Sequence, residues 1–221
     1  MSSLSTVVTK PFRILDLPPE IRTKIYILLC TSPNPHISLS TPSSPFSEQV
    51  HPSFPHNLLL TNTQLYHELR PLYFTTNGFS LTIHRRNDEW SYFLSPSFLD
   101  NRRQIHSLRI VVTRWGSKDF FCKSLVPVLE DCVLHGKLRS LEVVVRESFL
   151  KGLGIVGTGG GFENWKSLKA LLGDPYLESA RLLAGSLGCG DGSETELTEF
   201  RDVTELIKTR DEPGNPVISY R

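Results

Sequence analysis

The residues of this sequence that could bind a cofactor begin with a run of glycines late in the chain. Gly152, Gly154 and Gly157 have the GxGxxG spacing with which a turn cradles the pyrophosphate of a dinucleotide. In such a site the first glycine directly follows a strand, and a helix begins inside the turn. Here residues 147–151 separate the glycines from the preceding apolar segment, and residues 158–161 (TGGG) oppose a helix. The sequence therefore predicts a glycine-rich loop and no cofactor.

Histidine and cysteine side chains form no recognisable metal-ligating or nucleophilic pattern. The seven histidines are isolated from one another, and the cysteines lack the CxxC pairing of a zinc site. Three histidines lie in a proline-rich segment, residues 31–57, where a weak metal site is the alternative. No P-loop lysine motif, HExxH or GxSxG occurs. We therefore expect no enzyme and no metal, and we expect Cys122 and Cys132 to be buried, reduced thiols.

The composition is typical of a soluble globular protein. Of the 221 residues, 39% are hydrophobic and 21% charged, and the formal net charge is +1. No apolar run approaches the length of a membrane span, and the first residues lack the pattern of a secretory signal. A basic stretch over residues 102–118 and an acidic one over 191–205 favour solvated faces. We expect an intracellular protein, cytoplasmic or nuclear, with no nucleic acid and no membrane as partners.

The first element that must position any binding residues is an amphipathic helix. Pro18 and Pro19 suit its first turn, and Glu20 favours the positive end of the helix dipole. Its apolar residues fall at i, i+4, i+7 and i+8, and they are Ile21, Ile25, Leu28 and Leu29. This spacing predicts one apolar stripe, which either packs in the core or contacts a partner.

A second helix is expected after the proline-rich segment, in which residues 36–40 suit a short edge strand. Thr61 and Gln64 match a capping box at its start, and Pro71 predicts a kink or a break. Asn77 and Gly78 end the element. Its apolar stripe consists of Leu65, Leu69, Leu72 and Tyr73.

The remaining pattern alternates strands and helices. Strands are predicted over residues 79–83, 105–112 and 138–145, and helices over 90–99, 119–135 (interrupted at Pro127), 162–172, 175–183 and 203–210. A strand, a helix and a strand of these lengths form a right-handed parallel crossover. We therefore predict an α+β or α/β fold, in which N-terminal helices pack on a small, partly parallel sheet with crossover helices.

Two segments together resemble the F-box-like proteins that are abundant in filamentous fungi. Residues 17–29 (LPPEIRTKIYILL) resemble the opening of an F-box, which is Leu-Pro, an acidic residue and an apolar helix. Residues 58–74 (LLLTNTQLYHELRPLYF), followed by Asn77 and Phe79, are similar to a second signature of these proteins. The resemblance implies an F-box-like helical segment over residues 1–78, with an insert at 31–57. Residues 79–221 would form an α/β domain packed with it, and residues 80–221 match no family.

The resemblance also implies a function and a binding site. F-box proteins dock on the Skp-type adaptor of cullin-RING ubiquitin ligases and recruit a protein substrate, whose identity the sequence does not indicate. The residues that would contact the adaptor are Leu17, Pro18, Ile21, Ile25, Leu28 and Leu29. The insert at 31–57 and the segment 66–68 (YHE) depart from the F-box pattern. The alternative is a ligase-independent scaffold or regulatory domain, in which the same stripe is core.

Overall fold

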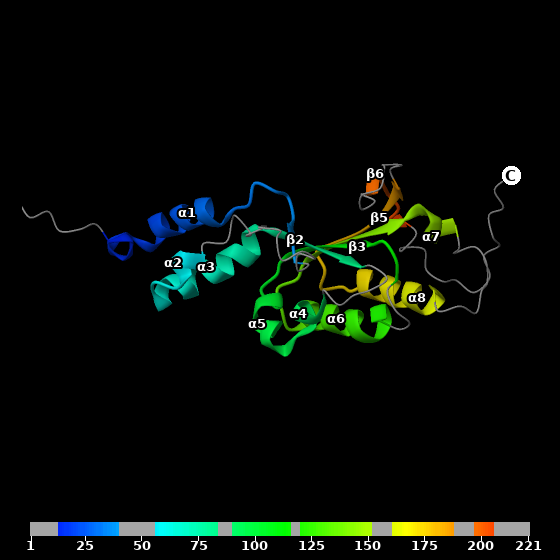
Figure 1. Ribbon diagram of the computed structural model, residues 1–221, viewed down its shortest axis with the longest axis horizontal. Helices are drawn as coiled ribbons and strands as arrows, with labels where there is room; N and C mark the ends of the chain where they lie inside the picture. The colour runs from blue at the N-terminus through cyan, green and yellow to red at the C-terminus, as the bar shows by residue number, and fades with distance from the viewer. Residues whose placement is uncertain are drawn as a thin grey trace, which may run out of the picture.

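A six-stranded sheet lies at the centre of the protein (Figure 1). The computed structural model describes residues 13–39, 56–83, 90–115, 120–151, 161–187 and 197–205. The strands follow one another in chain order, β1 to β6, and all neighbouring pairs are parallel except β5 and β6. Their bounds are Ile37–Ser38 (β1), Gly78–Ile83 (β2), Ser107–Val112 (β3), Ser140–Arg146 (β4), Ser179–Leu187 (β5) and Leu197–Asp202 (β6). This mostly parallel sheet with helices confirms the predicted fold class.

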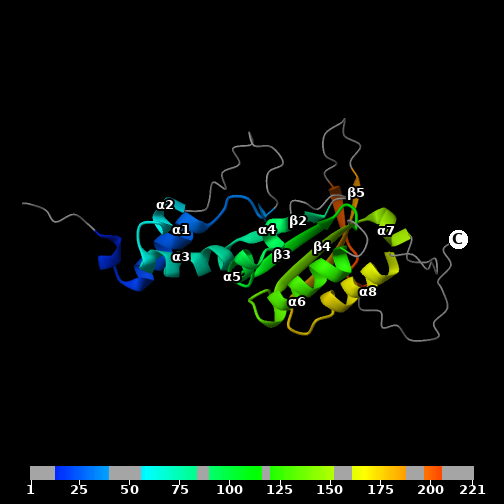
Figure 2. The same cartoon turned by 60° about the horizontal axis from the view of Figure 1, so that its bottom comes forward.

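Apart from α7, the α-helices form two groups. Helices α4, α5, α6 and α8 lie along one face of the sheet, whereas α1, α2 and α3 extend beyond its N-terminal end (Figures 1 and 2). The α-helices are α1 (Pro19–Cys30), α2 (His56–Leu59), α3 (Thr63–Thr76), α4 (Ser91–Leu94), α5 (Leu99–Arg102), α6 (Val126–Leu134), α7 (Glu147–Lys151) and α8 (Gly161–Leu172). Among the described residues, no helix has both the length and the apolar character needed to cross a membrane.

The hydrophobic core lies between the sheet and the helices that cover one of its faces. In β2 and β3 buried side chains alternate regularly with half-buried ones, as expected for strands with one covered face. The buried set comprises Phe79, Leu81 and Ile83 of β2, Leu108, Ile110 and Val112 of β3, and Leu141, Val143 and Val145 of β4. Leu129 of α6 and Leu168 of α8 belong to the same cluster.

The expected strands at 79–83, 105–112 and 138–145 are confirmed, and the helix expected at 175–183 is wrong. Residues from Ser179 onward form β5, which pairs along its length with β4. The antiparallel strand β6 was not predicted, and it ends at Asp202, immediately before the segment 203–210 in which a last helix was expected. Residues 206–210 of that expected helix lie outside the described residues, as does the glycine-rich loop at 152–160.

The two helices in which a proline was expected to cause an interruption behave differently. The interrupted helix is a π-helix over Phe120–Leu125 that continues as α6 from Val126, so the interruption lies next to Pro127 as expected. In contrast, α3 runs through Pro71 without a break. Its N-cap is Asn62, whose side chain accepts a hydrogen bond from the Gln64 amide at 2.7 Å, so the predicted capping box starting at Thr61 is wrong.

Part of the basic stretch is buried, although a solvated face was expected. Arg102 is only 8% exposed, and its Nη1 atom donates to the carbonyls of Phe93 and Ser95. Arg103 forms an ion pair with Asp131 at 2.6 Å. Arg102 thus satisfies carbonyls at the end of α4, and Arg103 connects the end of α5 to α6.

Trp90 occupies the part of the β2 edge that the short strand β1 leaves unpaired. β1 contributes only two residues to the pairing with β2, and the Leu39 amide donates to the Ser80 carbonyl at 2.9 Å. Two residues further along, the Thr82 carbonyl accepts from the indole N–H of Trp90 at 2.9 Å. Trp90 is 2% exposed, so its indole covers this part of the β2 edge.

Candidate protein-binding surface on helix α1

Helix α1 begins and ends where its sequence predicts. Pro18 is the N-cap, Pro19 is the first helical residue, and Glu20 lies in the first turn. At the other end, the Thr31 amide and hydroxyl both donate to the Ile27 carbonyl, at 3.0 and 2.6 Å. The helix therefore holds four of the predicted binding residues, Ile21, Ile25, Leu28 and Leu29, and Leu17 and Pro18 directly precede it.

The buried face of α1 is not the apolar stripe. The buried residues of α1 are Arg22, Tyr26 and Cys30, spaced four apart on one face. Helix α1 lies beside α3, which buries Leu65, Leu69, Tyr73 and Phe74 (Figure 1). An arginine thus takes a position where an apolar residue is usual, so it needs charged and polar partners.

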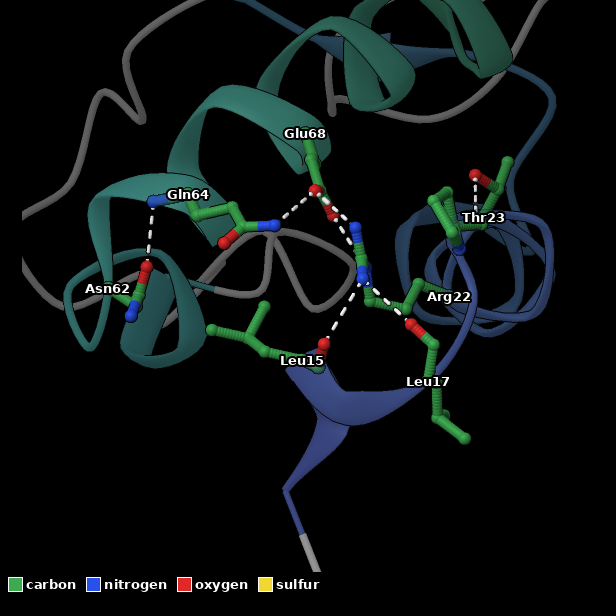
Figure 3. Close-up of polar contacts among 8 residues, drawn as sticks. Leu15, Leu17, Arg22, Thr23, Asn62, Gln64 and Glu68 are labelled. Carbon is green, nitrogen blue, oxygen red and sulfur yellow. Dashed lines mark hydrogen bonds and ion pairs between the residues drawn. The ribbon is translucent and has the colours of Figure 1, made fainter.

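Arg22 finds these partners on two segments (Figure 3). Its Nε and Nη2 atoms donate to the two carboxylate oxygens of Glu68 in α3, at 3.1 and 2.8 Å. Its Nη1 atom donates to the backbone carbonyls of Leu17 at 2.8 Å and Leu15 at 3.3 Å. Gln64 donates to the same carboxylate at 2.9 Å. This bidentate pair fixes the rotation of α1 about its own axis relative to α3.

The hydrogen bonds shift both ionisations in the direction that strengthens the pair. The Arg22 guanidinium, followed by the Gln64 amide, lowers the pKa of the Glu68 carboxyl below its ordinary value of 4.5. Reciprocally, the hydrogen bond to Glu68 raises the pKa of Arg22. At neutral pH both groups are charged, so the pair is intact.

Because α1 is oriented by Arg22, its apolar stripe faces away from α3. Of the predicted binding residues, Leu28 is 82% exposed, Leu29 46% and Ile21 42%. Pro18 is exposed, whereas Leu17 and Ile25 are half-buried. We call these six predicted residues the α1 apolar face. The alternative in which this stripe is core is wrong for its three most exposed members.

Sequence reasoning missed three features of this site. Ile27 is 39% exposed and adds to the apolar surface, although it lies off the predicted stripe. The stripe Arg22, Tyr26 and Cys30 was not recognised as the buried one, although its spacing of four was visible in the sequence. The pairing of Arg22 with Glu68, 46 positions away, had no local signal.

Asn77 joins this helical portion to the sheet. It follows α3 and precedes β2, and it is only 5% exposed. Its side-chain N–H group donates to the carbonyls of Cys30 and Tyr73, both at 2.8 Å, and its oxygen accepts from the Ser32 amide at 2.8 Å. The C-terminal ends of α1 and α3 therefore meet at one amide, which fixes the end of α1.

The described residues give little support to a metal site or a reactive cysteine. Among them, no group of three histidine, cysteine or acidic side chains could hold a metal ion. Cys30 and Cys132 are buried free thiols, and burial raises their pKa to about 11 and about 12. Cys122 is also a reduced cysteine and is half-buried. The burial expected of the cysteines is thus confirmed for Cys132 and incomplete for Cys122.

Comparisons with known proteins do not assign the chain to a family. No protein-family model matches it, and no curated protein or solved structure matches it either.

Proposed function

We propose that this protein is a substrate-recruiting subunit of a cullin-RING ubiquitin ligase, and that it docks on a Skp-type adaptor through the α1 apolar face. The observation that carries the proposal is the orientation of α1. Arg22 lies buried against α3, and Leu28, Leu29 and Ile21 lie exposed. A short helix that presents isoleucine and leucine side chains at this spacing suits an apolar groove on a partner.

Exposure of these apolar side chains to water is unfavourable in free energy, and docking on a partner would remove them from water. Burying one leucine or isoleucine side chain contributes about 1.5–3 kcal/mol. Contiguous exposed apolar residues on one helix face are more informative than scattered ones. Ile21, Leu28 and Leu29 lie on one side of α1 at helical spacing, with the half-buried Ile25 between them, and the exposed Ile27 is their neighbour in sequence.

The long insert, which departs from the F-box pattern, does not separate the two helices in space. Helices α1 and α3 pack side by side although residues 40–55 intervene in the chain. The resemblance concerns these two segments, so their pairing supports a single F-box-like unit.

The test is co-purification with a Skp-type adaptor from a filamentous fungus. We compare the wild type with Leu28→Asp and Ile21→Asp, which place a charge on the α1 apolar face. The matched control is Leu134→Asp, because Leu134 is 56% exposed on α6, away from α1. We expect the wild type and the control to form a stoichiometric complex with the adaptor. The α1 variants are expected to bind the adaptor at least tenfold more weakly.

The folding of each variant is checked by urea unfolding. Substitutions at exposed positions are expected to change the free energy of unfolding by no more than about 0.5 kcal/mol. A wild type that does not bind the adaptor would contradict the proposal and favour the ligase-independent scaffold. If folded α1 variants still bind the adaptor, the docking surface lies elsewhere on the protein.

A further inference from the structure

One lysine side chain lies in the middle of the exposed side of α1. The charged residues of this helix are Glu20, Arg22 and Lys24. Arg22 is buried and paired with Glu68 of α3, whereas Glu20 and Lys24 are exposed. Helix α1 lies at one end of the molecule with α3 beside it (Figures 1 and 2). A partner that docks on the exposed side of α1 therefore meets charge as well as apolar side chains.

The helical periodicity places Lys24 opposite the buried face of α1. Residues two positions apart on an α-helix point to nearly opposite sides. Lys24 is two positions from both Arg22 and Tyr26, and Leu28 is two positions from both Tyr26 and Cys30. Because Arg22, Tyr26 and Cys30 form the buried face, Lys24 and Leu28 point away from it, one turn apart.

The neighbours of Lys24 on the helix surface are mostly apolar. They lie three or four positions before and after it, and they are Glu20, Ile21, Ile27 and Leu28. Ile21 is 42% exposed, Ile27 39% and Leu28 82%. Lys24 lies between Ile21 and Leu28 along the helix, and between Ile21 and Ile27 around it. A partner that covers these three apolar side chains therefore also covers the ammonium group of Lys24.

The ammonium group of Lys24 has no partner of its own in the part of the chain that the structure describes. Neither a hydrogen bond nor an ion pair joins it to another described residue, including Glu20 one turn earlier. In water such a group needs no partner, and an exposed ion pair would contribute little. In an interface the same group is removed from water, which is unfavourable unless an opposite charge lies close by.

The length of the lysine side chain does not by itself solve this problem. A lysine can lay its aliphatic part along an apolar surface and hold its ammonium group in water at the edge. On both sides of Lys24, however, an exposed isoleucine extends the apolar surface, Ile21 on one side and Ile27 on the other. The charge complement must therefore come from the partner.

We infer that the partner's groove carries a carboxylate opposite Lys24, so that Lys24 determines which adaptor the α1 apolar face accepts. This pairing rests on the function proposed above, because the partner is the Skp-type adaptor. A groove that is only apolar leaves the ammonium group without a partner, and a groove with a basic residue at this place repels it. Charges arranged in this way contribute mainly to the specificity of an interface.

The main test variant is Lys24→Met, which keeps an unbranched side chain and removes its charge. If the groove carries a carboxylate, the variant leaves that carboxylate unpaired in the complex. We therefore expect Lys24→Met to bind the adaptor at least tenfold more weakly than the wild type does. If the groove is only apolar, methionine suits it at least as well as lysine, and binding stays equal or becomes tighter. Lys24→Arg keeps the charge and is expected to bind more tightly than Lys24→Met.

The matched control is Lys166→Met, because Lys166 is exposed on α8, which lies along the sheet and away from α1. This control is expected to bind the adaptor as the wild type does. Affinities are measured by isothermal titration calorimetry at low and at high salt, and folding is checked by urea unfolding. Salt should weaken the wild-type complex more than the Lys24→Met complex, since only the wild type has the ion pair that salt screens.

Glu20→Gln tests whether the acceptor of the ammonium group in the complex is a residue of α1 itself. We expect this variant to bind the adaptor as the wild type does. If Glu20→Gln and Lys24→Met instead lose the same affinity and the double variant loses no more, the acceptor is Glu20 and a partner carboxylate is contradicted.

The adaptor assay separates this pairing from the proposed function. A Lys24→Met variant that binds as tightly as the wild type, or with the same salt dependence, would overturn the pairing and leave adaptor docking intact. A wild type that does not bind the adaptor would overturn both.

Discussion

Arg22 of α1 and Glu68 of α3 form a bidentate ion pair, with Nε–Oε2 and Nη2–Oε1 distances of 3.1 and 2.8 Å. The pair lies on the face of α1 that packs on α3, while Leu28 on the other side is exposed. A helix with a leucine-rich stripe normally buries that stripe. This one buries the arginine, so the pair decides which side of α1 solvent or a partner can contact.

Removal of either partner of the pair is expected to destabilise the protein. In Arg22→Ala the Glu68 carboxylate loses both hydrogen bonds from the guanidinium and keeps only that from Gln64, and in Glu68→Ala the guanidinium loses its charged acceptor. We expect a lower urea midpoint for each single variant. The double variant should lose clearly less than the sum of the two, because the second substitution removes a group that is already unpaired. Strictly additive losses would contradict a direct coupling.

Acid is expected to weaken the same contact. The pKa of Glu68 is lowered by Arg22 in the folded state, and that of Asp131 is lowered by Arg103. A carboxyl with a lowered pKa contributes stability above its unfolded-state pKa and loses it as the pH falls through the folded value. The free energy of unfolding should therefore decline below about pH 4.5. Glu68→Gln and Asp131→Asn should each flatten this decline, which urea titrations from pH 7 to pH 3 would measure. An unchanged acid profile in both variants would contradict it.

Asn77→Ala is expected to cost about 1–3 kcal/mol, because it removes the side-chain hydrogen bonds of Asn77 to the Cys30 carbonyl and from the Ser32 amide. The measurement is the free energy of unfolding from urea titration. Thr76→Ala serves as the control, since Thr76 is exposed at the end of α3. If both variants unfold at the same urea concentration, the three hydrogen bonds of Asn77 contribute nothing measurable.

The thiols of Cys30 and Cys132 are expected to resist alkylation in the folded protein. Burial raises their pKa to about 11 and about 12, so the reactive thiolate is scarce at pH 8. Iodoacetamide labelling followed by peptide mass spectrometry should show slow reaction at both residues, and rapid reaction after unfolding in urea. Equal labelling rates with and without urea would mean that these segments open readily.

The strands that the sequence predicted share a clear local signal. Residues 107–112 and 140–145 are rich in valine, leucine and isoleucine, and their β-branched side chains favour extended backbone. In β5 the corresponding residues are Ala180, Leu182, Leu183 and Ala184, which favour helices. Their pairing with β4 overrides this preference, so only the tertiary structure makes the segment a strand.

The binding surface could be predicted only in part for a similar reason. The spacing of Ile21, Leu28 and Leu29 placed them on one face of a helix, which the structure confirms. Whether that face is inside or outside depends on Arg22 and its distant partner Glu68, which no periodicity reveals. The contact between Phe200 of β6 and Arg109 of β3 likewise depends on how β5 and β6 bend, because these two strands lie three positions apart in the sheet.

The chain order of the strands has a consequence for biosynthesis. Gly78 pairs with Ser107, Ser107 with Ser140, and Ser140 with Ser179, so each parallel strand adds beside the one synthesised before it. Each of these pairings closes a loop of only roughly 30–40 residues. The sheet can therefore grow in the direction of translation, since none of these strands waits for a segment still inside the ribosome. The antiparallel β6 is added last, beside β5 at the growing edge.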